Sequence, residues 1–422
     1  MSQQKAYVES LGIGARDAAA KLVRSTGAQR NAALTEMARA IRAGASELIA
    51  ANALDVAAAE QAQLPVATVE RLRLTDKRVE QMASGVEAIA RQIDPVGQTI
   101  EGYVRPDGLR IEKRRVPIGV ILFFYESRPN VTSDAAALCL KSGNAVILRG
   151  GKEALHSNLA ISKIISASLA SAGLPPACVQ MVDNPDRALV PMLLKLDKHI
   201  DLVIPRGGES LIRAVVADST IPVLKHFTGN CHVYIDADID GIEQQAIDLC
   251  VNAKTSYPGG GVCNAVEHIL VHRHAAAKLL IPLCTALAAK QVEIRGDADV
   301  VNAFASAKPA SEKDWDEEYL AFIVGIKIID SIDDAIAHIN RHGSHHTDAI
   351  VSTSLASIDA FTSAVDSASV MVNASTRLAD GGEYMLGAEI GISTDKLHAR
   401  GPMGAYDLTT YKWIVTGKGH LR

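Results

Sequence analysis

The amino-acid sequence predicts an α/β fold built from two doubly wound domains. From residue 116 to about residue 226, short apolar strand candidates alternate with helical segments, and a second alternating unit follows. Alternation at this spacing is typical of parallel sheets whose two faces are covered by helices. The 422 residues contain no internal repeat and no low-complexity linker. We therefore expect the domains to be interleaved along the chain.

The first hundred residues are predicted to be largely helical. Residues 15–93 are rich in alanine, and Thr75 followed by Asp76 is a helix start signal. Two apolar sets recur at helical spacing, and each is expected to share one face: Leu34, Met37, Ala38, Ile41, Leu48 and Ile49 in the first, and Val79, Met82, Val86 and Ile89 in the second.

The pattern changes at Glu101, where an arm is predicted. Residues 103–116 alternate around a Pro106-Asp107-Gly108 turn, which indicates an exposed hairpin with a basic second strand. Residues 408–415 are predicted to form one more strand, a candidate to pair with this hairpin.

The first alternating unit has predicted strands at 118–125, 145–148, 179–182 and 200–204, and helices at 132–141, at 153–172 and from Glu209 onward. Helix N-cap candidates at the first of these helices are Thr132, Ser133 and Asp134. The second unit has predicted strands at 262–271, 321–329, 349–351 and 370–372. Doubly wound sheets bind ligands at the carboxyl ends of their strands.

Two runs at such strand ends are candidate dinucleotide-binding segments: Arg149-Gly150-Gly151 and Arg206-Gly207-Gly208. Glycine lets the backbone approach a phosphate, and arginine supplies a bidentate cation. Neither standard nucleotide fingerprint is present in the sequence. Two tight turns without a ligand remain an equal alternative.

Composition excludes several classes of protein. The net charge of −5 and pI near 6.2 argue against a general nucleic-acid binder or a protein of anionic membrane surfaces. No apolar run is long enough for a membrane span, and the first residues lack the apolar core of a signal peptide. Six cysteines without paired spacing predict free thiols in a reducing compartment, so we expect a cytoplasmic protein.

Cys263 is the candidate nucleophile. It follows the glycine-rich run Pro258-Gly-Gly-Gly261-Val262, which would expose the sulfur, although a structural turn is the alternative. The other cysteines are expected to be core residues or to lack an activating neighbour. Two histidine clusters lack a carboxylate at ligand spacing, so no metal site is expected: His342, His345 and His346, and His268, His272 and His274.

Several separate motifs along the whole chain resemble the gamma-glutamyl phosphate reductase family of the aldehyde dehydrogenase superfamily. They begin at Val116-Pro-Ile-Gly-Val, Tyr125-Glu-Ser-Arg-Pro-Asn-Val-Thr, Cys139-Leu-Lys-Ser-Gly-Asn-Ala, Leu202-Val-Ile-Pro-Arg-Gly-Gly, Val262-Cys-Asn-Ala, His342-Gly-Ser-His-His-Thr-Asp, Asn373-Ala-Ser-Thr-Arg and Gly387-Ala-Glu-Ile-Gly. One departure stands before the nucleophile. The family usually has Thr-Gln-Arg-Pro-Gly, whereas this chain has Thr255-Ser-Tyr-Pro-Gly-Gly-Gly, without the arginine.

The resemblance implies an aldehyde-dehydrogenase-like fold with three parts. A dinucleotide-binding domain is expected at 1–100 and 117–226, a catalytic domain at 227–404, and a small β oligomerisation arm at 101–116 and 405–422. It also implies NADPH-dependent reduction of L-glutamyl 5-phosphate to L-glutamate 5-semialdehyde and phosphate, in proline biosynthesis. A homo-oligomer is expected, with glutamate kinase as a possible partner.

The resemblance also assigns roles to residues. Cys263 would form a thioester, and its N–H with the Asn130 amide would bind the oxyanion, although Asn130 could instead cap a helix. Arg149 would contact the 2′-phosphate of NADPH and Glu318 the nicotinamide ribose. Candidates for holding phosphate or the charged groups of the substrate are His226, Lys254, Arg128 and Arg377.

Two rival functions remain open. One is an aldehyde dehydrogenase that hydrolyses its thioester, and the other is a catalytically silent scaffold that binds the kinase. Hydrolytic relatives carry a glutamate base in a Glu-Leu-Gly-Gly segment, whereas the stretch here, residues 224–230, has no carboxylate. Lys225 and His226 at this place favour holding phosphate over activating water.

Overall fold

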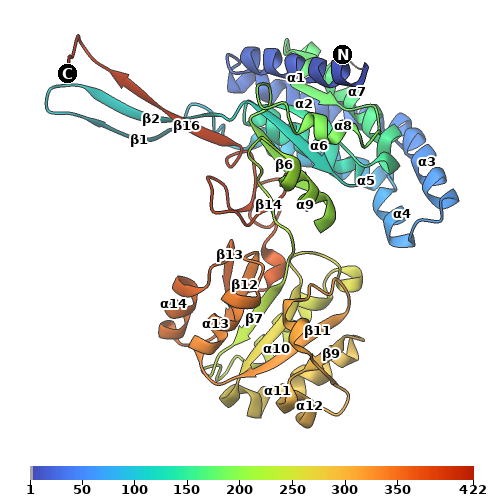
Figure 1. Ribbon diagram of the computed structural model, residues 1–422, viewed down its shortest axis with the longest axis vertical. Coiled ribbons are helices and arrows are strands. Elements are labelled where there is room, and N and C mark those ends of the chain that lie inside the picture. Colours follow the sequence, from blue (N-terminus) through green and yellow to red (C-terminus); the bar gives the residue numbers. More distant parts are fainter. Residues whose placement is uncertain (1–2) are drawn as a thin grey trace.

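Two α/β lobes and a projecting β arm make up the protein (Figure 1). The structure, a computed structural model, describes residues 3–422. The first lobe contains the amino-terminal helices and a four-stranded sheet, and the second contains a seven-stranded sheet. Among the helices of residues 3–422, none is both long and apolar enough to cross a membrane.

The first of the amino-terminal helices packs on the first sheet, and the others pack mainly on other helices. These helices are α1 (Gln3–Leu22), α2 (Gly27–Ala43), α3 (Ala45–Gln61), α4 (Val66–Leu72) and α5 (Asp76–Arg91). The predicted helix start at Thr75 is confirmed, because its side chain accepts a hydrogen bond from the Arg78 amide. The expectation that Leu48 and Ile49 continue the face of Ile41 was wrong, because the chain turns at Gly44 and both belong to the next helix.

The four strands of the first sheet are parallel and stand in the order β5-β4-β3-β6. They are β3 (Val120–Tyr125), β4 (Ala145–Arg149), β5 (Val179–Met181) and β6 (Leu202–Arg206). The helices of this unit are α6 (Pro129–Lys141), a short 3-10 turn (Lys152–Ala154), α7 (Leu155–Ser171), α8 (Leu189–Leu193) and α9 (Glu209–Asp218). After β5 the chain crosses to the other side of β3. This reversal confirms a doubly wound sheet, with its ligand crevice at the carboxyl ends of β3 and β6.

Helix α6 begins three residues earlier than predicted. Pro129 takes the first helical position and Arg128 is the N-cap residue, without a side-chain cap bond. The expected caps Thr132 and Ser133 are instead buried within the helix. The Thr132 hydroxyl bonds to Tyr125 and Asn158, because polar groups inside a packed core require partners.

The second sheet is also wholly parallel, in the order β10-β9-β11-β8-β7-β12-β13. Its strands are β7 (Cys231–Ile235), β8 (Val266–His272), β9 (Glu293–Gly296), β10 (Lys308–Pro309), β11 (Ile323–Ile329), β12 (Thr347–Val351) and β13 (Ser369–Val372). Its helices are α10 (Glu243–Thr255), α11 (Arg273–Ala289), α12 (Ala298–Ala303), α13 (Ile332–His342) and α14 (Leu355–Ala364).

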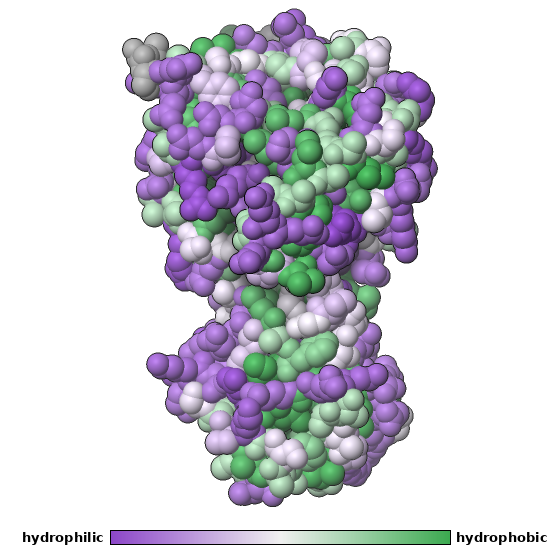
Figure 2. Space-filling view, turned by 90° about the vertical axis from the view of Figure 1, so that its right-hand side faces the viewer, coloured by the Kyte–Doolittle hydropathy of each residue, from purple (hydrophilic) through white to green (hydrophobic). Residues whose placement is uncertain are grey.

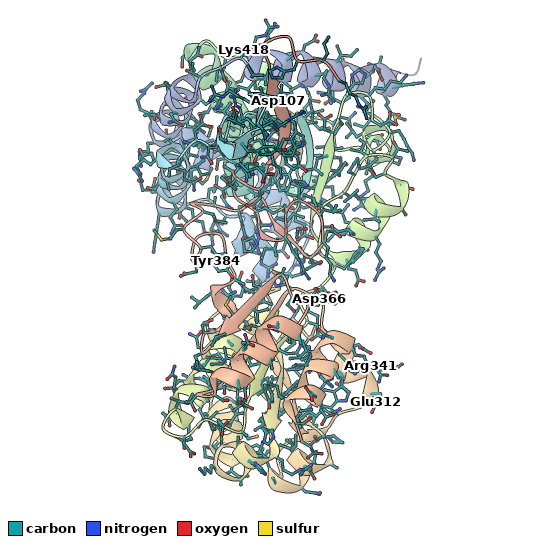
Figure 3. All side chains as sticks on the ribbon, turned by 90° about the vertical axis from the view of Figure 1, so that its left-hand side faces the viewer. Asp107, Glu312, Arg341, Asp366, Tyr384 and Lys418 are labelled. Atoms are coloured by element: carbon teal, nitrogen blue, oxygen red, sulfur yellow. The ribbon has the colours of Figure 1, made fainter. Side chains whose placement is uncertain are left out.

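After the second sheet the chain returns to the first lobe. Ile390, Ala399 and Met403 pack into the same core cluster as β3 and α6, and β14 (Ile392–Ser393) pairs with β15 (Gly401–Pro402). This differs from the expected end of the second domain at residue 404. Tyr384 lies near the junction of the two lobes (Figure 3), and its hydroxyl donates to the Ser369 hydroxyl. The return segment therefore ties the lobes together.

The arm forms as predicted from the hairpin and the tail. Antiparallel strands β1 (Thr99–Val104) and β2 (Arg110–Pro117) pair around the Pro106-Asp107-Gly108 turn, and β16 (Thr409–Thr416) pairs with β2. The arm extends well away from the first lobe (Figure 1), with Asp107 and Lys418 near its tip (Figure 3). In the view from the side opposite to that of Figure 3, the space-filling surface narrows between the two lobes (Figure 2).

Candidate active site

A cavity of about 670 Å³ is lined by residues of both lobes and contains Cys263. From the first lobe it takes the segments that follow β3 and β6, including Glu126, Arg128 and Arg206. From the second it takes segments that precede strands, because Cys263 lies just before β8 and His226 before β7. The cavity thus joins the carboxyl ends of one sheet to the amino ends of the other.

Cys263 is the cysteine that is partly exposed. Of the six cysteines, all within the described residues, the other five are buried and none is in a disulfide. Asn264, the next residue, is buried, and its side-chain amide donates to the Ala379 carbonyl. Thr376 donates to the Asn264 carbonyl. These bonds hold the backbone next to Cys263 in place.

Gly229 packs directly against the backbone of Cys263. A Cβ at position 229 would lie 1.9 Å from the Cys263 carbonyl oxygen, so only glycine fits there. The Gly229 amide donates to Glu318 Oε1 at 2.8 Å, which holds the Glu318 carboxyl at the cavity wall. Burial raises the pKa of Glu318.

The surroundings of Cys263 favour the neutral thiol over the thiolate. Burial, with a further effect of the Glu389 carboxylate, raises its pKa to about 12, and Arg206 opposes this. Arg206 and Glu389 face each other at 3.6 Å. A cation or a bound ligand near the sulfur is therefore needed before the thiolate becomes the main form.

Two imidazoles lie beside Cys263. One ring nitrogen each of His226 and His346 and the Cys263 sulfur all lie within 4.8 Å of one another. His226 Nδ1 lies 2.8 Å from the Ile392 carbonyl oxygen, so Nδ1 carries the proton and Nε2 keeps a lone pair. Burial lowers the pKa of both histidines, that of His346 to about 3.

Comparison with known proteins identifies the family. The profile of the aldehyde dehydrogenase family matches residues 2–308. The crystal structure of gamma-glutamyl phosphate reductase from Thermotoga maritima is 41% identical over 98% of this chain and 99% of that chain, with a TM-score of 0.95. The chain belongs to the aldehyde dehydrogenase family, among the gamma-glutamyl phosphate reductases.

Two further structures are similar to this chain, one in sequence and fold and the other in fold alone. Gamma-glutamyl phosphate reductase from Saccharomyces cerevisiae is 30% identical over 100% of this chain and 99% of that chain, with a TM-score of 0.55. An acetylating aldehyde dehydrogenase from Geobacillus thermoglucosidasius, 18% identical over 100% of this chain and 98% of that chain, has a TM-score of 0.69 and shares the fold. The aldehyde-dehydrogenase-like fold predicted from sequence is thereby confirmed.

Not every residue expected from this family's motifs reaches the thiol. Asn130 is exposed in the wall of a neighbouring cavity of about 290 Å³, and its amide donates to Asp134 at 3.0 Å. It is not among the described residues that line the Cys263 cavity. Arg128 and Tyr257 line both cavities. The oxyanion pair expected of Cys263 and Asn130 is thus not assembled in this structure.

Lys254 is not among the described residues that line the Cys263 cavity. Its ammonium lies 2.6 Å from Glu267, and both side chains are wholly buried, since α10 packs this position against β8. Lys225, expected beside His226 as a second cation, is bound by Asp395 through both its ammonium and its backbone amide. Arg377 does line the cavity, where its Nε donates to the Ser256 hydroxyl at 3.2 Å.

The expected cofactor residues fall into two places. Gly207, Gly208 and Glu318 line the Cys263 cavity, and the Gly208 amide donates to Glu126. Arg149, Gly150 and Gly151 lie at the end of β4, one strand from β3. Here Arg149 Nη2 is 3.3 Å from each of the Pro185 and Asp186 carbonyl oxygens.

Sequence reasoning gave no role in the site to several residues of the cavity group, among them Glu126, Tyr257, Glu389 and, beside the sulfur, His346. Glu389 stands within the Gly387-Ala-Glu-Ile-Gly motif, which carried the family resemblance without a role for the carboxyl group. His346 belongs to a histidine cluster in the sequence. Spacing alone could not connect it to Cys263, because His346 precedes β12 and Cys263 precedes β8.

Proposed function

We propose that this protein reduces L-glutamyl 5-phosphate to L-glutamate 5-semialdehyde and phosphate with NADPH, as a step of proline biosynthesis. The observation that carries the proposal is an accessible cysteine in an interlobe cavity of a chain 41% identical to a gamma-glutamyl phosphate reductase. A carboxylate resists hydride, and its activation as an acyl phosphate removes that resistance.

The chemistry begins at Cys263. Its thiol gives a proton to water, the sulfur bonds to the acyl carbon, and the bond from that carbon to the phosphate oxygen breaks, which releases phosphate and leaves a thioester. NADPH, when bound, supplies the hydride that reduces this thioester. The carbon–sulfur bond then breaks, the sulfur takes up a proton, and the aldehyde leaves.

The residues present accommodate such a cofactor at two points. Arg149 stands at the carboxyl edge of the first sheet, where its guanidinium suits a 2′-phosphate, and only long bonds to two carbonyl groups engage its Nη2. Glu318 stands beside Cys263 and suits a ribose hydroxyl. Gly150 has a packing reason as well, because a Cβ there would lie 2.3 Å from the Asn158 amide nitrogen.

Cationic side chains would hold the anionic groups of the substrate. Arg128 lies between the two cavities, and Arg377 stands near the Cys263 loop. His226, with a free lone pair or a proton at Nε2, is our candidate for the leaving phosphate. Arg71 and Arg78 line the smaller cavity, so a carboxylate of the substrate would find cations on that side also.

We further propose a cytoplasmic homo-oligomer. On the arm, about half the surface of each of three aromatic side chains is exposed: Tyr103, Tyr411 and Trp413. A second copy of the chain would cover these side chains. The six free cysteines suit a reducing compartment. An acyl phosphate hydrolyses readily in water. We therefore also propose that the protein contacts the glutamate kinase that makes this substrate.

The deciding experiment supplies glutamyl phosphate, generated in place by glutamate kinase and ATP, and follows NADPH oxidation. We expect oxidation that requires the kinase, and loss of it in Cys263→Ser. Cys139→Ala, Cys178→Ala and Cys284→Ala are matched controls, since these cysteines are buried and are not among the described residues that line the cavity. Full turnover by a folded Cys263→Ser would remove the nucleophile, and no turnover by the native chain would favour the scaffold.

A further inference from the structure

Cys263, His226 and His346 together resemble the ligand set of a metal site. The three potential ligand atoms, one sulfur and two ring nitrogens, lie within 4.8 Å of one another. They come from three separate approaches to the second sheet, before β8, β7 and β12. In a tetrahedral zinc site, bonds of about 2.0–2.3 Å place such atoms about 3.5 Å apart, so side-chain shifts of about 1 Å would suffice.

Both imidazoles are prepared as ligands. A metal-binding histidine needs one nitrogen without a proton, and its other nitrogen is usually held by a carbonyl or hydroxyl group. His226 meets this condition, because its Nδ1 lies 2.8 Å from the Ile392 carbonyl oxygen. His346 meets it as well, with Nδ1 2.9 Å from the Thr347 hydroxyl and Nε2 buried without a hydrogen-bond partner among the described residues.

The unpartnered Nε2 of His346 is the second, independent sign. A buried polar atom without a partner is costly, and the few that persist call for an explanation. His346 is wholly buried, and its ring lies edge to face with that of His226 at 5.4 Å. A cation shared with Cys263 would satisfy this nitrogen.

Charge around the sulfur also suits a cation. The carboxyl groups of Glu389 and Glu318 line the same cavity as Cys263. A divalent ion displaces the thiol proton and binds the sulfur as thiolate. The ion forms one metal–sulfur bond, and the proton goes to solvent.

We propose that Cys263, His226 and His346 form an inhibitory binding site for a thiophilic divalent cation, of which Zn²⁺ is the type. Three protein ligands leave a fourth position open toward the cavity, as in zinc sites that keep a water molecule. With its sulfur bound to the metal, Cys263 cannot attack an acyl carbon. The cation is a reversible blocker of the site and takes no part in the reaction, and its binding does not depend on the proposed substrate.

The first test uses cobalt as a spectroscopic probe. Full-length protein, freed of metal with a chelator, is titrated with Co²⁺ while its absorbance is recorded. We expect a near-ultraviolet thiolate-to-cobalt band together with visible bands of tetrahedral strength. Cys263→Ser should abolish the thiolate band, and His346→Gln should weaken Co²⁺ binding by at least about tenfold. His345→Gln, the adjacent histidine, should bind as the native chain does.

The second test needs no variant and so does not depend on their folding. Native protein is labelled with iodoacetamide at buffered free Zn²⁺ concentrations, and the peptide that contains Cys263 is followed by mass spectrometry. We expect Zn²⁺ to slow the alkylation of Cys263, and a chelator to restore it. Alkylation indifferent to Zn²⁺, a cobalt–thiolate band that survives Cys263→Ser, or unchanged affinity in His346→Gln would each overturn the site.

Discussion

The ammonium of Lys254 lies 2.6 Å from the carboxylate of Glu267, and neither side chain has any solvent exposure. Burial raises the pKa of Glu267 to about 7 and lowers that of Lys254. Each charge is tolerated because the other stands beside it. This pair joins α10 to β8 immediately on either side of the Cys263 loop, so it is part of the support of the site.

Lys254→Met is therefore expected to destabilise the protein rather than to impair phosphate binding. Removing one member of a buried ion pair typically costs about 3–5 kcal/mol of unfolding free energy. Urea denaturation followed by tryptophan fluorescence would measure this. The double variant Lys254→Met/Glu267→Leu should recover much of the loss. A stable Lys254→Met with a raised KM for phosphate would restore Lys254 as a ligand.

The alkylation rate of Cys263 should report on its charged neighbours. Because burial and Glu389 raise the pKa of the thiol to about 12, the thiolate is a minor form at neutral pH. Its fraction, and hence the rate with iodoacetamide, should rise about tenfold per pH unit between pH 7 and 9. Glu389→Gln removes a negative charge, lowers the thiol pKa and should speed labelling at pH 7.

Arg206→Gln is the matched opposite of that change. The guanidinium favours the thiolate, so its removal should raise the thiol pKa and slow labelling. Peptide mass spectrometry at fixed reagent concentration gives both rates. The same direction of change in the two variants would mean that accessibility, not charge, controls the reaction.

Arg149 is expected to set the preference for NADPH. Its planar guanidinium can bind a dianionic 2′-phosphate through two hydrogen bonds, which NADH cannot provide. Arg149→Ala should raise the Kd for NADPH by about tenfold or more and leave that for NADH nearly unchanged. Equilibrium binding followed by nicotinamide fluorescence measures both. An equal loss for the two cofactors would indicate a role in supporting the carbonyl groups of Pro185 and Asp186.

The arm should be the oligomer contact. Trp413 is about half exposed on β16, where Lys113 lies 5.6 Å above its ring. Trp413→Asp would place a charge in any interface formed there, at a cost that would shift the chain toward monomers. Light scattering coupled to size-exclusion chromatography measures the mass. Lys290→Asp, at the end of α11 in the second lobe, is the control. An unchanged mass in Trp413→Asp would place the contact elsewhere.

The regular parts of the fold could be predicted because their patterns are local. The apolar run at β3 and the Pro-Asp-Gly turn of the arm each carry their own signal. The return segment around Ile390 and Met403 has no such period, since its apolar residues fill gaps in a core built by others. Its place in the first lobe follows from packing, which spacing along the chain does not reveal.

The part of the candidate site that could be predicted is the part marked by neighbouring residues in the sequence. Cys263 was singled out by the glycine-rich run before it, and the structure leaves it accessible. The burial of Lys254 was not predicted, because a lysine on a helix is usually solvated. A signal was present, since Glu267 interrupts the apolar strand β8 and a buried carboxylate needs a cation. Asn130 faces Asp134 because helix α6 begins at Pro129, which no cap motif announced.

The last prediction concerns what attacks the thioester when the reaction runs backward from L-glutamate 5-semialdehyde. The segment at residues 224–230 carries no carboxylate to activate water. His226 lies beside Cys263, and burial keeps it neutral by lowering its pKa. Lys225 is bound by Asp395, so the cations of the cavity wall that could accompany a phosphate there are Arg128, Arg206 and Arg377.

Reduction of NADP⁺ by the semialdehyde should therefore require inorganic phosphate. Nε2 of the neutral His226 ring can accept a hydrogen bond from the P–OH group of monohydrogen phosphate. His226→Ala removes this partner of a charged ligand, a loss of about 1.5 kcal/mol or more, so the KM for phosphate should rise by about tenfold. Initial rates over a phosphate series, with His345→Ala as the control, would test this. Water is expected to compete poorly with phosphate, because residues 224–230 supply no carboxylate as general base. Steady NADPH production in carefully phosphate-free buffer would show that water does attack, through a base such as Glu389 in the same cavity, and would make this chain a hydrolytic aldehyde dehydrogenase.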